Sequence, residues 1–91
     1  MGVTDIEVTL YGSLADVAGR RRCRIRVRAE GARGPTVREL RAALVREVPA
    51  LAPYLDHAAI GRGTELLPDD GILESHGASD EIAVLPPVSG G

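Results

Sequence analysis

Two short runs in which apolar and polar residues alternate constrain the fold of this chain more than any other feature. Apolar side chains occupy every second position of residues 6–10 and again of residues 23–27, with polar or charged side chains between them. A period of two is typical of strands that bury one face and expose the other. The sequence therefore predicts two strands that pair as a hairpin. Their connection, residues 12–19, is long for a tight turn, and we expect a short helical turn there that ends at Gly19.

A single main helix is predicted after this hairpin. Thr36 and Glu39 have the spacing of a capping box, in which the threonine hydroxyl and the glutamate carboxylate satisfy backbone amides at a helix start. Pro49 is expected to end the helix. Apolar residues at intervals of three and four give it one apolar stripe, made of Val37, Leu40, Leu44 and Val48.

The remaining segments complete an α+β pattern. Residues 50–57 could form another short turn, and residues 59–63 are predicted to be extended. Residues 81–85 form a final strand, closed by a proline pair that cannot donate to a ladder. One helix over a small mixed sheet is the arrangement of the β-grasp, or ubiquitin-like, fold. We therefore predict a single β-grasp domain over residues 1–85, in which one main helix covers a mixed sheet, and a flexible C-terminal tail over residues 86–91.

The distribution of charge limits the possible functions. Every basic side chain is an arginine, so the chain cannot carry an isopeptide bond on a lysine of its own, and self-linked chains are excluded. The half that leads into the tail is acidic and could steer it toward a basic partner surface, although a solvated face is the commoner meaning. The arginines of residues 20–28 could contact phosphate, but a solvated outer strand face is favoured. A net charge of −2 and only two aromatic residues argue against nucleic-acid binding.

Other candidate sites are weak. Cys23 alternates with apolar residues and is predicted to be a buried structural thiol rather than a nucleophile. His57 and His76 are isolated, so we assign them no catalytic role and expect no metal site. No phosphate-binding or dinucleotide fingerprint is present, so no cofactor is expected on this chain. The N-terminus lacks a signal peptide and no apolar stretch is long enough to span a membrane, which favours a cytoplasmic protein without membrane contact.

The most informative functional feature is the terminal diglycine, Gly90-Gly91. Two residues without side chains can thread a narrow channel and present the α-carboxylate to the active site of a partner. The alternative is a frayed end without a role.

The segment from Asp80 to Gly91 resembles the C-terminus of the MoaD/ThiS sulfur-carrier family, and most closely that of the small subunit of molybdopterin synthase. In that family an acidic turn, an apolar strand, Pro-Pro-Val, Ser or Thr, and Gly-Gly follow in this order. The resemblance implies that a MoeB-like adenylating and sulfurating enzyme uses ATP to adenylate the Gly91 carboxylate, after which sulfur replaces AMP to give a thiocarboxylate. A MoaE-like large subunit then uses this sulfur for dithiolene formation in molybdenum cofactor biosynthesis. The chain itself would be a non-catalytic sulfur donor.

The resemblance also assigns roles to other residues. The residues that would thread the channel of a partner are Pro86, Pro87, Val88, Ser89 and Gly90. Tyr11 and Leu85 match the exposed apolar residues that the family uses for partner binding. For Tyr11, the alternative is that its ring caps the core while its hydroxyl is hydrogen-bonded. Leu85 stands where some relatives have an aromatic residue, which leaves the identity of the partner open.

Two other functions stay possible from the sequence. The chain could carry sulfur for another pathway, such as that of thiamine, cysteine or a sulfur-containing secondary metabolite. It could also be a ubiquitin-like modifier, in which Gly91 is joined to a lysine of another protein, or a plain interaction module.

Overall fold

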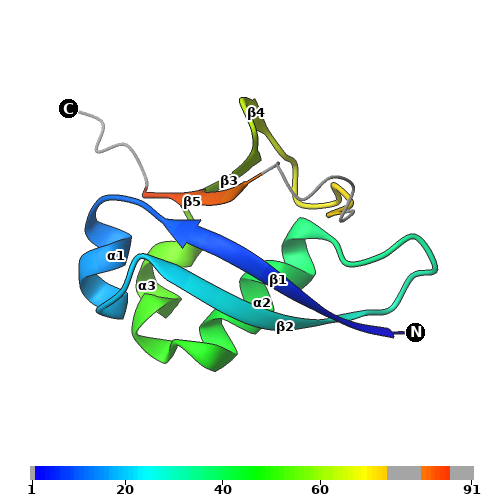
Figure 1. Ribbon diagram of the computed structural model, residues 1–91, viewed down its shortest axis with the longest axis horizontal. Coiled ribbons are helices and arrows are strands. Elements are labelled where there is room, and N and C mark those ends of the chain that lie inside the picture. The colour runs from blue at the N-terminus through cyan, green and yellow to red at the C-terminus, as the bar shows by residue number, and fades with distance from the viewer. Residues whose placement is uncertain (1, 74–80, 87–91) are drawn as a thin grey trace.

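The structure is a computed structural model that describes residues 2–73 and 81–86, which form one mixed sheet with helices packed on one face (Figure 1). The strand order is β2-β1-β5-β3-β4. β1 (Gly2–Leu10) and β2 (Arg22–Ala29) pair antiparallel, as the two alternating runs predict, with Ile6 opposite Ile25. β1 begins before the apolar alternation does, because residues 2–5 still pair with the end of β2.

The C-terminal strand lies in the middle of the sheet. β5 (Ile82–Leu85) runs parallel to β1 and antiparallel to β3 (Ala59–Arg62), so that Val84 pairs with Leu10 on one side and Ile60 on the other. Parallel neighbours need a long crossover, and the chain between β1 and β5 supplies it. A short β4 (Glu65–Leu66) completes the sheet beside β3. The predicted β-grasp fold is confirmed.

The main helix begins and ends close to where the sequence predicts. In α2 (Val37–Glu47), the Glu39 amide donates to Thr36 Oγ1 at 3.2 Å, and the Thr36 amide donates to Glu39 Oε1 at 2.8 Å. The second Glu39 oxygen accepts the Glu30 amide at 3.0 Å. Glu39 thus joins the segment that follows β2 to the start of the helix, and the capping box is confirmed.

Pro49 does not simply end a helix but also begins a new turn. It opens η1 (Pro49–Leu51), which continues into α3 (Ala52–Leu55). Proline suits a first helical turn, where its missing amide has no intrahelical partner. These turns and α1 (Ser13–Ala18) bring Leu14, Leu51 and Leu55 into the core, each no more than 1% exposed. The predicted helical turn of α1 ends, as expected, with Gly19 in a left-handed conformation.

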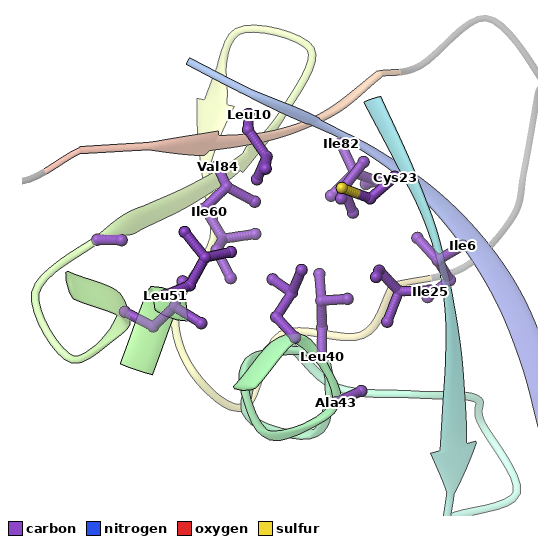
Figure 2. Packing of buried hydrophobic residues seen from close by; sticks show 14 of the residues in the cluster. Ile6, Leu10, Cys23, Ile25, Leu40, Ala43, Leu51, Ile60, Ile82 and Val84 are labelled. Atoms are coloured by element: carbon purple, nitrogen blue, oxygen red, sulfur yellow. The ribbon is translucent and has the colours of Figure 1, made fainter. Parts of the chain in front are cut away.

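The core lies between the sheet and α2 (Figure 2). Inward side chains of β1, β2, β3 and β5 meet Leu40 and Ala43 of the helix, and Cys23 of β2 lies among them, 3% exposed. This confirms that Cys23 is buried. The opposite, outer face of the sheet is not covered by the described helices. The polar residues that alternate with the buried ones in β1 and β2 lie on that face.

Candidate functional site

The chain leaves the sheet toward its C-terminus where β1 and β5 end side by side. The Tyr11 amide donates to the Val84 carbonyl at 3.1 Å, just beyond the end of β1. The next residue, Gly12, packs against Pro86, the last described residue, so closely that a Cβ on Gly12 would lie 3.1 Å from Pro86 Cγ. Gly12 has φ 58° and ψ −135°, a conformation open to glycine and strained for other residues. The Gly12 backbone therefore determines where the first residue of the tail can lie.

A cluster of two hydroxyls and one carboxylate lies beside this exit. Thr9 Oγ1 donates to one oxygen of Glu81 at 2.9 Å, and the Tyr11 hydroxyl donates to the other at 2.6 Å. Both carboxylate oxygens are thereby engaged, and the end of β1 is connected to the residue that precedes β5. Tyr11 and Glu81 lie toward opposite ends of the β1–β5 pairing. The Tyr11 side chain must therefore extend along the outer face of the sheet to reach the Glu81 carboxylate.

The two partners shift each other's titration. The hydrogen bond from Tyr11 lowers the pKa of the Glu81 carboxyl below its ordinary value, and Thr9 and the positive charge of Arg22 act in the same direction. The same bond raises the pKa of the Tyr11 phenol, while the charges of Arg21 and Arg22 oppose that rise. At neutral pH the cluster therefore holds a protonated phenol against a charged carboxylate, which is the stronger form of this hydrogen bond.

The predicted partner-binding residues lie near each other. The pairing of Leu10 with Val84 continues by one residue to place Tyr11 beside Leu85, both on the outer face. Tyr11 is 38% exposed and Leu85 is half-buried. The Tyr11 hydroxyl is hydrogen-bonded, as the alternative for this residue requires, but its side chain lies outside the buried core. Their role in partner binding stays a prediction.

Leu66 is an exposed apolar residue on this side of the sheet, and the sequence analysis missed it. Leu66 of β4 is 68% exposed and lies over Gly61 of β3, its partner in the register. A Cβ on Gly61 would come within 2.8 Å of the Glu65 carbonyl oxygen. Glycine is needed there because β4 folds back so closely on β3.

Several predicted residues cannot be placed. Pro87, Val88, Ser89, Gly90 and Gly91 lie outside the described residues, as does His76. Their predicted roles, and the boundary between domain and tail, stay predictions.

His57 is exposed, and within residues 2–73 and 81–86 no three side chains of His, Cys, Asp or Glu gather in a way that could hold a metal ion. In the same part of the chain, no helix has both the length and the apolar character needed to cross a bilayer.

Sequence reasoning missed Gly12, Thr9 and Glu81 as members of the site. A glycine close behind an alternating run signals a backbone that ordinary residues avoid, and this signal could have singled out Gly12. The contacts of Thr9 and Glu81 join residues 72 positions apart and depend on the register of β1 against β5, for which the sequence carries no local signal.

Comparison with known proteins identifies the family. The model of the ThiS family matches residues 8–91, which includes Thr9, Tyr11, Gly12 and the whole C-terminal segment. The chain belongs to the ThiS family. No curated protein matches this ThiS-family chain in sequence.

Solved structures agree with this assignment. The crystal structure of SAMP1 from Haloferax volcanii is 34% identical, with a TM-score of 0.70, and the match covers 97% of this chain and 100% of that one. A crystal structure described as H. volcanii small archaeal modifier protein 1 is 30% identical, with a TM-score of 0.68, over 93% of this chain and 99% of that one. The solution structure of the H. volcanii HVO 2177 protein, at 24% identity and a TM-score of 0.68 over 99% and 89% of the two chains, shows the fold alone.

Proposed function

We propose that this ThiS-family chain is a sulfur carrier that holds sulfur as a thiocarboxylate on Gly91. The observation that carries the proposal is the family match, which extends through Gly91. The geometry of the exit supports it. Gly12 and Pro86 set the start of the tail, beside Tyr11 and Leu85 on the uncovered outer face, so a partner that receives the tail can contact these side chains at the same time.

The chemistry requires a partner enzyme. A carboxylate is anionic at neutral pH and a poor electrophile, so one of its oxygens must first become part of a leaving group. Attack of the Gly91 carboxylate on ATP releases pyrophosphate and forms an acyl-adenylate. A sulfur nucleophile then forms the bond to the acyl carbon and expels AMP. We place the ATP site and the catalytic groups on the partner, which leaves this chain as a non-catalytic sulfur donor.

The destination we propose is the pterin chemistry of molybdenum cofactor biosynthesis, with this chain as the small subunit of molybdopterin synthase. The order of residues from Asp80 to Gly91 supports this destination. A MoeB-like enzyme would load the chain. A MoaE-like large subunit would then receive the tail and place its nucleophilic sulfur against the pterin precursor.

A second candidate is a ubiquitin-like protein modifier. It is favoured by the name of a relative, because a structure 30% identical to this chain is that of small archaeal modifier protein 1. In this function the activated Gly91 carbonyl is attacked by a lysine of another protein and an isopeptide bond forms. Both candidates begin with the same acyl-adenylate, so they differ only in the nucleophile that follows.

The experiment that separates them is the intact mass of the protein from its native cell, kept free of alkylating agents, with fragmentation to locate any change. Replacement of one oxygen by sulfur at Gly91 supports the carrier, whereas a Gly91 linked to a lysine of another protein supports the modifier. A gain of oxygen on Met1 or Cys23 has nearly the same mass, so the fragment must contain Gly91. An unmodified Gly91 in the presence of an active adenylating partner contradicts both.

Gly91→Ala tests the need for a terminal residue without a side chain. We expect loading by the adenylating partner to fall by about tenfold or more, because a methyl group crowds the reacting carbon and small misplacements are costly there. The melting temperature should not change. Gly2→Ala is the matched control, because a Cβ at Gly2 meets no atom within 4 Å. Loading of Gly91→Ala at the rate of Gly2→Ala would contradict the channel argument.

A further inference from the structure

We infer that the outer face of β2 is a docking surface for an acidic patch on the enzyme that receives the tail. The surface is the arginine row, defined as Arg22, Arg24, Arg26 and Arg28. This inference rests on the proposed function, since it assumes that a partner takes up Gly91.

The alternation of β2 places all four arginines on one face. Buried and exposed residues alternate strictly along the strand, and every exposed position of the strand is an arginine. Alternate residues of a strand are about 6.7 Å apart, so the row is about 20 Å long. Because β2 is an edge strand of the sheet, a partner can reach the row from above and from the side (Figure 1).

Neighbouring acidic residues offset only part of this positive charge. The register places Asp5 opposite Arg26, and Arg26 Nε lies 3.3 Å from Asp5 Oδ1. No other arginine of the row forms an ion pair within residues 2–73 and 81–86. Arg24 lies opposite Glu7 in the register, whereas Arg22 and Arg28 face Thr9 and Val3, which carry no charge. The Arg26 side chain is itself 73% exposed, and an ion pair so exposed leaves most of its charge available to a partner.

The row is continuous with the tail exit. Its first member, Arg22, is close enough to Glu81 for its charge to lower the pKa of that carboxyl, and it also acts on the phenol of Tyr11. From there the row runs along the outer face, away from Pro86. A partner that accepts the tail and contacts Tyr11 therefore lies over at least the first part of the row.

A shallow hollow marks the other end of the row. Arg26 and Arg28 line it together with Arg46, which comes from α2, and with Val3, which is 56% exposed. Three guanidinium groups beside an exposed apolar side chain suit a carboxylate on a partner, since guanidinium binds carboxylates in a two-pronged geometry.

The chemistry of the chain favours an acidic protein surface over nucleic acid as the occupant. The net charge is −2, and neither of the two tyrosines belongs to the arginine row. Binding of single strands usually combines basic grooves with aromatic side chains on which bases stack. The opposite edge of the sheet, β4, carries Glu65, so the two edges of the sheet differ in charge.

The test compares two variants that lose the same charge. Arg24→Gln with Arg28→Gln removes half of the row, and Arg33→Gln with Arg38→Gln removes two exposed arginines elsewhere. The measurement is kcat/KM for Gly91 loading by the adenylating enzyme of the same cell, at about 0.05 M and about 0.3 M salt. We expect the row variant to lose about tenfold at low salt, mostly through KM, and the loss to shrink at high salt. The control variant should match the wild type.

The outcomes are distinct. If the wild type is loaded and the row variant is loaded equally well at both salt concentrations, the docking inference is wrong while the proposed function stands. If the wild type is not loaded by an enzyme that is active on another carrier, both fail. If the row variant instead loses binding to a single-stranded DNA probe, with loading unchanged, the occupant is a nucleic acid and the inference is overturned. If the arginine row served only to prevent edge-to-edge aggregation, the row variant would change in solubility but not in KM.

Discussion

Replacement of Gly12 by alanine should disturb the exit of the tail while the domain stays folded. The residue has φ 58° and ψ −135°, and a side chain in such a sparsely populated region costs about 1–3 kcal/mol. The new Cβ would lie 3.1 Å from Pro86 Cγ, whereas carbon atoms pack best at about 3.5–4.0 Å. Either Pro86 moves away by about half an ångström, or the backbone of Gly12 rotates and displaces it.

The expected magnitudes follow from these values. A loss of about 2 kcal/mol lowers the melting temperature of a domain of this size by about 8–16 °C. Domains are typically stable by about 5–15 kcal/mol, so the variant should remain folded at room temperature. A misplacement of about 1 Å can cost about a hundredfold in rate, but the expected shift of Pro86 is only about half as large. We therefore expect kcat/KM for Gly91 loading to fall by about three- to tenfold.

Gly19→Ala is the matched control. Gly19 ends the same short helix, has φ 77°, and has no atom within 4 Å of where its Cβ would be. The Gly19→Ala variant should lose about 1–2 kcal/mol of stability without any change in the loading of Gly91. In Gly12→Ala combined with Pro86→Ala the close contact is gone, so loading should match that of Pro86→Ala alone. The reasoning is refuted if Gly12→Ala is loaded as fast as Gly19→Ala at a temperature where both are folded.

The remaining predictions concern stability. Thr36→Ala removes one half of the capping box and should lower the free energy of unfolding in urea by about 0.5–2 kcal/mol, and an unchanged midpoint would contradict the observed cap. The pKa values of Glu39 and Glu81 are lowered from the ordinary 4.5, first by the Thr36 amide and the Tyr11 hydroxyl respectively. Their charged forms thus stabilise the folded state, and this contribution is fully present above pH 4.5 and is lost as the pH falls through the folded pKa values. In Tyr11→Phe the pKa of Glu81, measured by NMR titration, should rise toward its ordinary value, while that of Glu39 should not move.

Local signals in the sequence predicted the elements of the fold. The alternation of β2, for instance, lets its apolar residues face α2 whichever strands it pairs with, so its inward and outward residues could be assigned correctly. The capping box of Thr36 and Glu39 involves residues three positions apart, and its geometry follows once the helix forms. The role of Pro49 was harder to predict, because a proline can end one helix and also begin the next turn.

The candidate site depended on contacts that only the tertiary structure decides. Its tail residues were recognised from their order in the sequence, but Gly12 and Glu81 were not. Tyr11 reaches Glu81 across 70 positions because β5 inserts beside β1 in one register, and a shift by one residue would turn Glu81 to the other face. The sequence by itself determined which segments become strands and helices, since those preferences are local. Which strands become neighbours, and so which side chains surround the exit of the tail, depends on the burial of the whole core at once.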